Sequence, residues 1–223
     1  MAAPLRAILF DLDGTLLDTA PDMVGALNAL RREQHLPPLP FESVRSLVSH
    51  GAARLVKLGF PHADPETFTV LQQRYLEIYR GAISLETRLF TGMDRVLEEL
   101  AQRRLVCGIV TNKPAWLTHP LLDQLGLTSR FACVVSGDTV SARKPHAMPM
   151  LHAAKLAGVA AGECIYVGDA ERDIQAAHAA DMQGLVAAYG YLQPDEDWQA
   201  WGGDGVIKSP IDLLPWLEHS GRL

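Results

Sequence analysis

Five short apolar runs constrain the fold of this 223-residue chain more than any other feature of its sequence. Each run is continuously apolar rather than alternating, which is typical of strands that are buried on both faces of a parallel sheet. Helical patterns lie between the later runs, and this alternation predicts an α/β fold: a Rossmann-like parallel sheet with helices on both faces. The expected strands are 6–10, 105–110, 131–136, 164–167 and 184–187, and the expected helices are 93–104, 115–125, 148–157 and 174–180.

One segment, residues 20–82, interrupts the alternation because it contains helical patterns and no convincing strand. Thr19 with Pro21, and Asp64 with Pro65, are signals for the start of a helix. We therefore expect an inserted α-helical domain after the first strand, although these helices could instead be ordinary crossovers of the sheet. The predicted units are an α/β core of residues 1–18 and 84–223 and a helical insert of residues 19–83.

Composition and charge exclude several classes of protein. The chain has 20 basic and 26 acidic residues and a net charge of −6, so we expect no nucleic-acid partner. Its apolar runs are too short for a membrane span or a signal peptide, which predicts no membrane partner. The three cysteines lie in apolar runs without a C-x-x-C pair, which favours buried, reduced thiols and a cytoplasmic location.

Polar residues follow four of the expected strands, at the edge where open α/β sheets bind their ligands. These residues are Asp11 and Asp13, then Thr111, Asn112 and Lys113, then Lys144, and finally Asp169 and Asp173. Four carboxylates that meet at one edge repel each other unless positive charge joins them, and Mg²⁺ is a hard cation that prefers oxygen ligands. Lys144 would add a second positive charge. The pattern therefore predicts a magnesium site that binds a phosphate group.

This arrangement suits phosphoryl transfer. A carboxylate can attack phosphorus to give an aspartyl phosphate, and Asp11 is placed for that attack. Asp13 could protonate the leaving oxygen and then activate a water molecule. Thr111 and Lys144 would hold phosphoryl oxygens, Asn112 would help to bind the phosphate or the rest of the substrate, and Asp169 would bind the metal. For Asp11 the alternatives are a helix cap or a buried salt bridge, and Asp173 could simply be a favourable charge at a helix N-terminus.

Four motifs together resemble the haloacid dehalogenase-like hydrolase superfamily. They are Asp11-Leu12-Asp13-Gly14-Thr15, Val110-Thr111-Asn112, Lys144-Pro145, and Gly168-Asp169 with Asp173. The resemblance covers nearly the whole chain, and it implies an aspartyl-phosphate mechanism, a Mg²⁺ cofactor and a small α-helical cap formed by the insert. It also implies that Asp11 and Asp169 bind the metal through their side chains and Asp13 through its backbone carbonyl, while Asp173 orients a metal-bound water or Lys144.

Within that superfamily the chain resembles the phosphoglycolate phosphatase group. The supporting segments are Asp18-Thr19, residues 89–93, residues 111–114, Tyr189-Gly190-Tyr191 and residues 209–214. This resemblance implies a phosphatase, monomeric or homodimeric, that acts on a small phosphorylated metabolite, with 2-phosphoglycolate as the leading substrate. The segment around Tyr189-Gly190-Tyr191 and Trp201-Gly202 is also similar to phosphatases of N-acetylmuramic acid 6-phosphate. Another sugar-phosphate phosphatase, a phosphomutase similar to β-phosphoglucomutase, and a non-catalytic scaffold are further alternatives.

Three more residues are candidates for substrate contacts. Lys113 could touch the carboxylate or sugar of a substrate, and otherwise is a solvated loop lysine. Arg54 and His50 flank a break in a helical pattern of the insert, and either could face the substrate; a solvated helix face is the alternative for both.

Overall fold

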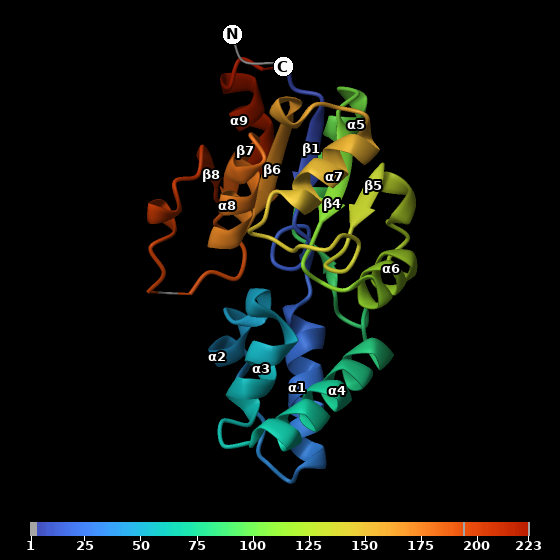
Figure 1. Ribbon diagram of the computed structural model, residues 1–223, viewed down its shortest axis with the longest axis vertical. Helices are drawn as coiled ribbons and strands as arrows, with labels where there is room; N and C mark the ends of the chain where they lie inside the picture. Colours follow the sequence, from blue (N-terminus) through green and yellow to red (C-terminus); the bar gives the residue numbers. More distant parts are fainter. Residues whose placement is uncertain (1–3, 194, 223) are drawn as a thin grey trace.

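A parallel six-stranded sheet forms the centre of the structure, a computed structural model that describes residues 4–193 and 195–222 (Figure 1). The strand order is β5-β4-β1-β6-β7-β8, so the first strand of the chain lies in the interior of the sheet. The strands are β1 (Ala7–Phe10), β4 (Val106–Val110), β5 (Cys133–Val135), β6 (Cys164–Gly168), β7 (Gln183–Ala187) and β8 (Gly205–Ile207). This is the expected Rossmann-like α/β fold.

Helices cover both faces of the sheet. Successive side chains of a strand point to opposite faces, and β1 shows the result: Ile8 and Phe10 belong to a buried cluster with residues of α5 and α9, whereas Ala7 and Leu9 cluster with residues of α7 and α8. Both faces of the central strand are therefore dry, which explains its continuous apolar sequence. The helices of this part are α5 (Met93–Gln102), α6 (Ala115–Gln124), α7 (Met148–Ala157), α8 (Glu171–Ala179) and α9 (Leu213–His219).

Four further helices, which we call the helical insert, lie beyond the carboxyl ends of the strands, while the start of β1 and the helix α9 lie toward the opposite end (Figure 1). They share one buried cluster, in which Leu27 and Leu30 of the first helix meet Leu71 and Tyr75 of the last. The helices are α1 (Ala20–Glu33), α2 (Phe41–Arg45), α3 (Gly51–Gly59) and α4 (Pro65–Gly81), with a 3-10 turn, η1 (Val48–His50), before α3.

The two connections between the sheet and the helical insert run side by side. They pair as a small antiparallel sheet of β2 (Leu17–Asp18) and β3 (Arg88–Leu89). Next to it, the buried carboxylate of Asp22 accepts hydrogen bonds from the backbone N–H of Glu86 and Thr87 and from the Thr87 hydroxyl, the last at 2.7 Å. The Asp22 carboxylate at the start of α1 thus binds the segment of residues 86–87, through which the chain returns from the helical insert to the sheet.

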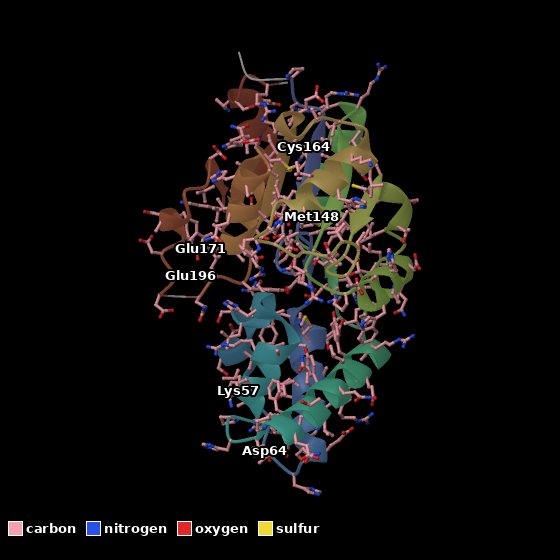
Figure 2. All side chains as sticks on the ribbon, in the orientation of Figure 1. Lys57, Asp64, Met148, Cys164, Glu171 and Glu196 are labelled. Carbon is pink, nitrogen blue, oxygen red and sulfur yellow. The ribbon has the colours of Figure 1, made fainter. Side chains whose placement is uncertain are left out.

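The structure confirms the five expected strands, the helices after them and both signals for a helix start. Asp64 caps α4, since its carboxylate accepts hydrogen bonds from the backbone N–H of Glu66 and Thr67 at 3.0 and 2.9 Å; it lies far from the sheet (Figure 2). Thr19 precedes α1 but its hydroxyl does not cap that helix. Among the strands and α-helices, β2, β3, β8 and α9 were not expected, and α8 begins at residue 171 rather than 174.

The three cysteines are free and buried, as the sequence predicts, with Cys164 on β6 (Figure 2). Burial raises the pKa of the Cys107 thiol to about 12 and those of Cys133 and Cys164 to about 11. Among the residues described, no helix combines the length and the apolarity that a membrane crossing requires.

Candidate active site

Asp11 directly follows β1, an interior strand, at the carboxyl end of the sheet. Its backbone N–H donates to the carbonyl of Val167 at 2.9 Å, which continues the pairing of β1 with β6 past the last strand residue. The N–H of Leu12 donates to Asp11 Oδ1 at 2.8 Å. The backbone therefore fixes this buried carboxylate at the point where the loops after β1, β4 and β6 meet.

The Lys144 ammonium group is completely buried and has a partner for each of its three protons. Nζ lies 2.9 Å from Asp11 Oδ1, 2.7 Å from Asp173 Oδ1 and 2.6 Å from the Tyr166 hydroxyl. The side-chain amide of Asn112 donates to the Lys144 carbonyl and accepts from its N–H, both at 3.0 Å. Asn112, predicted to bind phosphate, here holds the backbone of Lys144.

Three buried carboxylates gather beside this lysine. Asp11, Asp169 and Asp173 each offer an oxygen that lies within 4.8 Å of the oxygens of the other two. Burial, followed by the charges of Asp11 and Asp173, raises the pKa of Asp169 to about 7. Burial also raises the pKa of Asp173, although Lys144 opposes this shift. The cluster contains more negative than positive charge, and its oxygen donors are of the type that hard divalent cations bind.

Two glycines make room for Asp169. Gly14 has a positive φ of +83°, and a Cβ on it would lie 2.1 Å from Asp169 Oδ2. A Cβ on Gly190 would lie 2.4 Å from the Cβ of Asp169. Only a residue without a side chain fits at either position. The loop of Gly190 also contributes the backbone N–H of Tyr191, which donates to Asp169 Oδ2 at 2.9 Å.

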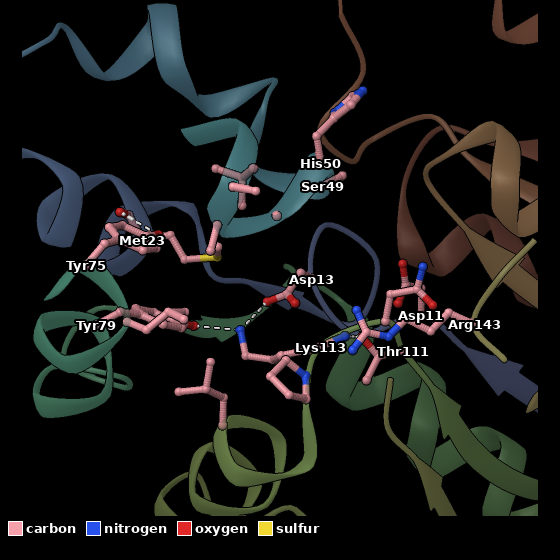
Figure 3. A pocket seen from close by; sticks show the side chains of 18 of the residues that line it. Asp11, Asp13, Met23, Ser49, His50, Tyr75, Tyr79, Thr111, Lys113 and Arg143 are labelled. Carbon is pink, nitrogen blue, oxygen red and sulfur yellow. Dashed lines mark hydrogen bonds and ion pairs between the residues drawn. The ribbon is translucent and has the colours of Figure 1, made fainter. Parts of the chain in front are cut away.

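Asp13 is oriented by two donors that bind the same oxygen. Its Oδ1 accepts from Lys113 Nζ at 2.9 Å and from the Thr19 hydroxyl at 2.7 Å. Lys113 Nζ in turn donates to the hydroxyl of Tyr79, on α4, at 2.8 Å (Figure 3). Because both donors use Oδ1, the second oxygen of Asp13 takes part in neither contact.

A cavity of about 430 Å³ separates this sheet edge from the helical insert. Asp11, Asp13 and Thr111 line it on one side, and side chains of the insert such as Met23 and Tyr75 line it on the other (Figure 3). The cavity thus has a polar, charged floor and a largely apolar wall, a combination that is common in sites for small molecules.

The structure brings together all but one of the residues that the sequence predicts for the site. Those that line the cavity are Asp11, Asp13, His50, Thr111, Asn112 and Lys113, and those buried behind its floor are Lys144, Asp169 and Asp173. Arg54 is exposed and lies outside the cavity lining, so the structure gives no support to a substrate contact from it.

Several residues at the site were missed, among them Tyr79, Ser49 and Arg172. Tyr79 reads in the sequence as a core residue of an amphipathic helix. Ser49 lies next to the His50-Gly51 break, and Arg172 lies between two predicted aspartates. Position along the chain was the only available signal for the last two.

Comparison with known proteins places this geometry in context. The family model described as haloacid dehalogenase-like hydrolase matches residues 8–187. A phosphoglycolate phosphatase of Xanthomonas campestris is 43% identical over 208 residues, which cover 93% of this chain and 94% of that protein. An N-acetylmuramic acid 6-phosphate phosphatase of Pseudomonas putida is 36% identical over 218 residues, covering 97% of both chains. The crystal structure of a predicted phosphoglycolate phosphatase from Haemophilus somnus shares the fold, with a TM-score of 0.85, 24% identity and coverage of 96% and 98%.

Proposed function

Because the chain belongs to the haloacid dehalogenase-like hydrolase family and is a phosphatase, we propose that it hydrolyses a small anionic phosphate monoester through an aspartyl phosphate on Asp11. The observation that carries this proposal is the position of the Asp11 carboxylate. It stands at the floor of the cavity, 2.9 Å from the Lys144 ammonium group and next to Asp169. A nucleophile, a cationic group for the phosphoryl oxygens and a candidate cation site therefore meet at one point.

In the first half of the proposed reaction an Asp11 carboxylate oxygen bonds to phosphorus and the bond between phosphorus and the ester oxygen breaks. Asp13 donates a proton to the departing alcohol oxygen. In the second half Asp13 takes a proton from a water molecule, which attacks the same phosphorus and releases inorganic phosphate. The Asp11 carboxylate and the protonated Asp13 are regenerated. The oxygen of Asp13 that neither Lys113 nor Thr19 contacts suits this proton transfer.

Lys144 and Thr111 are the proposed partners of the phosphoryl oxygens. Asp173 and the amide of Asn112 act as positioning residues, because the first binds the ammonium group of Lys144 and the second binds its backbone. Charge stabilisation and positioning supply most of the acceleration in phosphoryl transfer. A small displacement of Lys144 would therefore lower the rate.

The carboxylate cluster fits Mg²⁺. Its oxygens are close enough to share one ion, and the raised pKa of Asp169 reflects buried negative charge that Lys144 leaves uncompensated. We propose that Asp11 and Asp169 hold the ion through their side chains and Asp13 through its backbone carbonyl. Asp173 would orient Lys144 or a water molecule bound to the ion. When bound, Mg²⁺ would offset the charge of the carboxylates and the phosphoryl oxygens.

The proposed role of the helical insert is that of a cap, formed by residues 19–83. It supplies the apolar wall of the cavity and would keep bulk water from the reacting phosphate. It would also select the alcohol part of the substrate, because that part extends from Asp13 toward Tyr75 and Tyr79.

Two substrates are proposed, in order. For 2-phosphoglycolate, a carboxylate close to the ester oxygen would lie within reach of Lys113, which is already bound to Asp13. N-acetylmuramic acid 6-phosphate is the second candidate. The volume and the apolar wall of the cavity favour it, since a two-carbon acid needs little of either.

The test is a kinetic comparison of wild-type protein with Asp11→Asn and with Asp123→Asn, a surface control. We expect Asp11→Asn to lose at least about 10³-fold in kcat while the fold is retained. We also expect EDTA to abolish the activity of the wild type and added Mg²⁺ to restore it. Phosphate release by Asp11→Asn at the wild-type rate would refute the nucleophile. The ratio of kcat/KM for 2-phosphoglycolate and N-acetylmuramic acid 6-phosphate decides between the substrates.

A further inference from the structure

We infer that Ser49, a residue of the helical insert, is a positioning residue of the metal site, so that binding of a divalent cation and docking of the insert strengthen each other. This inference rests on the proposed function, because it takes Asp169 as a cation ligand. It goes beyond that function by assigning part of the cation's affinity to a residue outside the α/β core.

The contact that carries the inference is direct. Ser49 belongs to η1, at the tip of the insert that faces the sheet (Figure 3). Its hydroxyl donates to Asp169 Oδ2 at 2.7 Å. In the opposite direction, the guanidinium group of Arg172 donates to the Ser49 carbonyl at 2.7 Å. Ser49 is therefore both a donor to the carboxylate of Asp169 and an acceptor from Arg172, which lies in α8.

A second contact leads from the insert to the same carboxylate oxygen. The guanidinium group of Arg45, at the end of α2, lies 4.9 Å from the centre of the Tyr191 ring and donates to the Gly190 carbonyl at 3.3 Å. The backbone N–H of Tyr191 donates to Asp169 Oδ2. Docking of η1 and α2 therefore supports both hydrogen bonds that orient this oxygen.

The physical reason for an effect on the cation is orientation. Two donors on Oδ2 fix the rotation of the Asp169 carboxylate, whereas Oδ1 has the Thr15 hydroxyl at 3.5 Å, a long and therefore weak contact. Groups that hold a metal ligand in this way commonly account for about 10- to 100-fold in metal affinity. Linkage is reciprocal: if the docked insert raises the affinity for the cation, the bound cation must favour the docked insert by the same factor.

The experiment measures Mg²⁺ binding by calorimetry on the full chain without substrate, so that turnover plays no part. Ser49→Ala removes the hydroxyl, and Ser49→Thr keeps it. Ser43→Ala is the matched control, since Ser43 lies in α2 and its hydroxyl donates to the nearby Pro40 carbonyl, away from the metal site. We expect Ser49→Ala to weaken binding by about tenfold or more, and Ser49→Thr and Ser43→Ala to bind as the wild type does.

Hydrogen exchange of residues 41–59 supplies the second readout. Mg²⁺ should slow exchange there in the wild type and in Ser43→Ala, and do so less in Ser49→Ala. If Ser49→Ala bound Mg²⁺ as tightly as the wild type while Asp169→Asn bound none, this inference would be overturned and the proposed function would stand. A wild type that binds no Mg²⁺ would overturn both the inference and the proposed cofactor.

Discussion

Lys113 joins Asp13 to the helical insert. Its Nζ lies 2.9 Å from Asp13 Oδ1 and 2.8 Å from the hydroxyl of Tyr79, and the side chains of Lys113 and Asp13 are only 5% and 16% exposed. An ion pair so far removed from water interacts strongly, and a group that breaks it must offer comparable compensation. We propose that the carboxylate of a substrate is such a group and that it binds Lys113.

Lys113→Met should lower kcat/KM for 2-phosphoglycolate by about 10- to 100-fold, since a hydrogen bond to a charged group contributes about 1.5–3 kcal/mol. A phosphate ester without a carboxylate should lose less. Steady-state kinetics with both esters checks this, with the exposed Lys155→Met as control. Equal losses for the two esters would mean that Lys113 serves Asp13 alone and does not contact the substrate.

Asp22→Asn should destabilise the protein by about 2 kcal/mol. The amide that replaces the carboxylate is uncharged and has one acceptor oxygen fewer, so the three donors of the 86–87 segment must share one oxygen and one of them faces the amide N–H₂ group. Urea denaturation measures the difference. Asp94→Asn breaks an exposed ion pair with Arg130 and should cost less than about 1 kcal/mol. Similar losses in the two variants would contradict the importance of the Asp22 contacts.

Metal-free protein should become less stable as the pH rises from about 4 to about 7. The pKa of Asp169 in the folded state is raised to about 7, above its ordinary value of 3.8, so the folded protein binds more protons in this interval than the unfolded chain. The stability that this proton contributes is present at low pH and is lost as the pH passes about 7. Melting temperatures in EDTA across this range test the expectation.

The matched variant for that measurement is Asp169→Asn, in which the side chain at position 169 cannot ionise. At pH 8 it should melt several degrees above the wild type without metal, since about 1 kcal/mol corresponds to about 2–4 °C for a chain of this size. Added Mg²⁺ should stabilise the wild type only. A metal-free Asp169→Asn that melts below the wild type at pH 8 would show that the carboxylate cluster is not under electrostatic strain.

Much of the fold could be predicted because its strands are buried on both faces. The runs around Ala7–Phe10 and Cys164–Gly168 have no polar interruption, and sequence periodicity detects such runs readily. β8 was missed because it is an edge strand of three residues that begins with a glycine. The start of α8 was missed because residues 171–173 are charged. They form the first turn of the helix and add nothing to its apolar face.

The floor of the site could be predicted because strand ends are predictable. Asp11 and Asp169 follow strands directly, and Lys144 lies in the loop after another. Ser49 and Tyr79 could not be found in this way, since their contacts depend on how the helical insert sits on the sheet, and no local pattern encodes that placement. The role predicted for Arg54 remains a prediction without structural support, because Arg54 is exposed and is not among the residues that line the cavity.

The interior position of β1 affects how a newly made chain acquires its chemistry. Asp11 leaves the ribosome long before the residues it needs, because Phe10 pairs with Val167, and Asp169 and Tyr191 come later still. Closing such a long loop is slow compared with forming a local helix. A nascent chain therefore stays inactive until the segment through Tyr191 has emerged. The return of enzymatic turnover after dilution from denaturant would report the end of folding rather than its beginning.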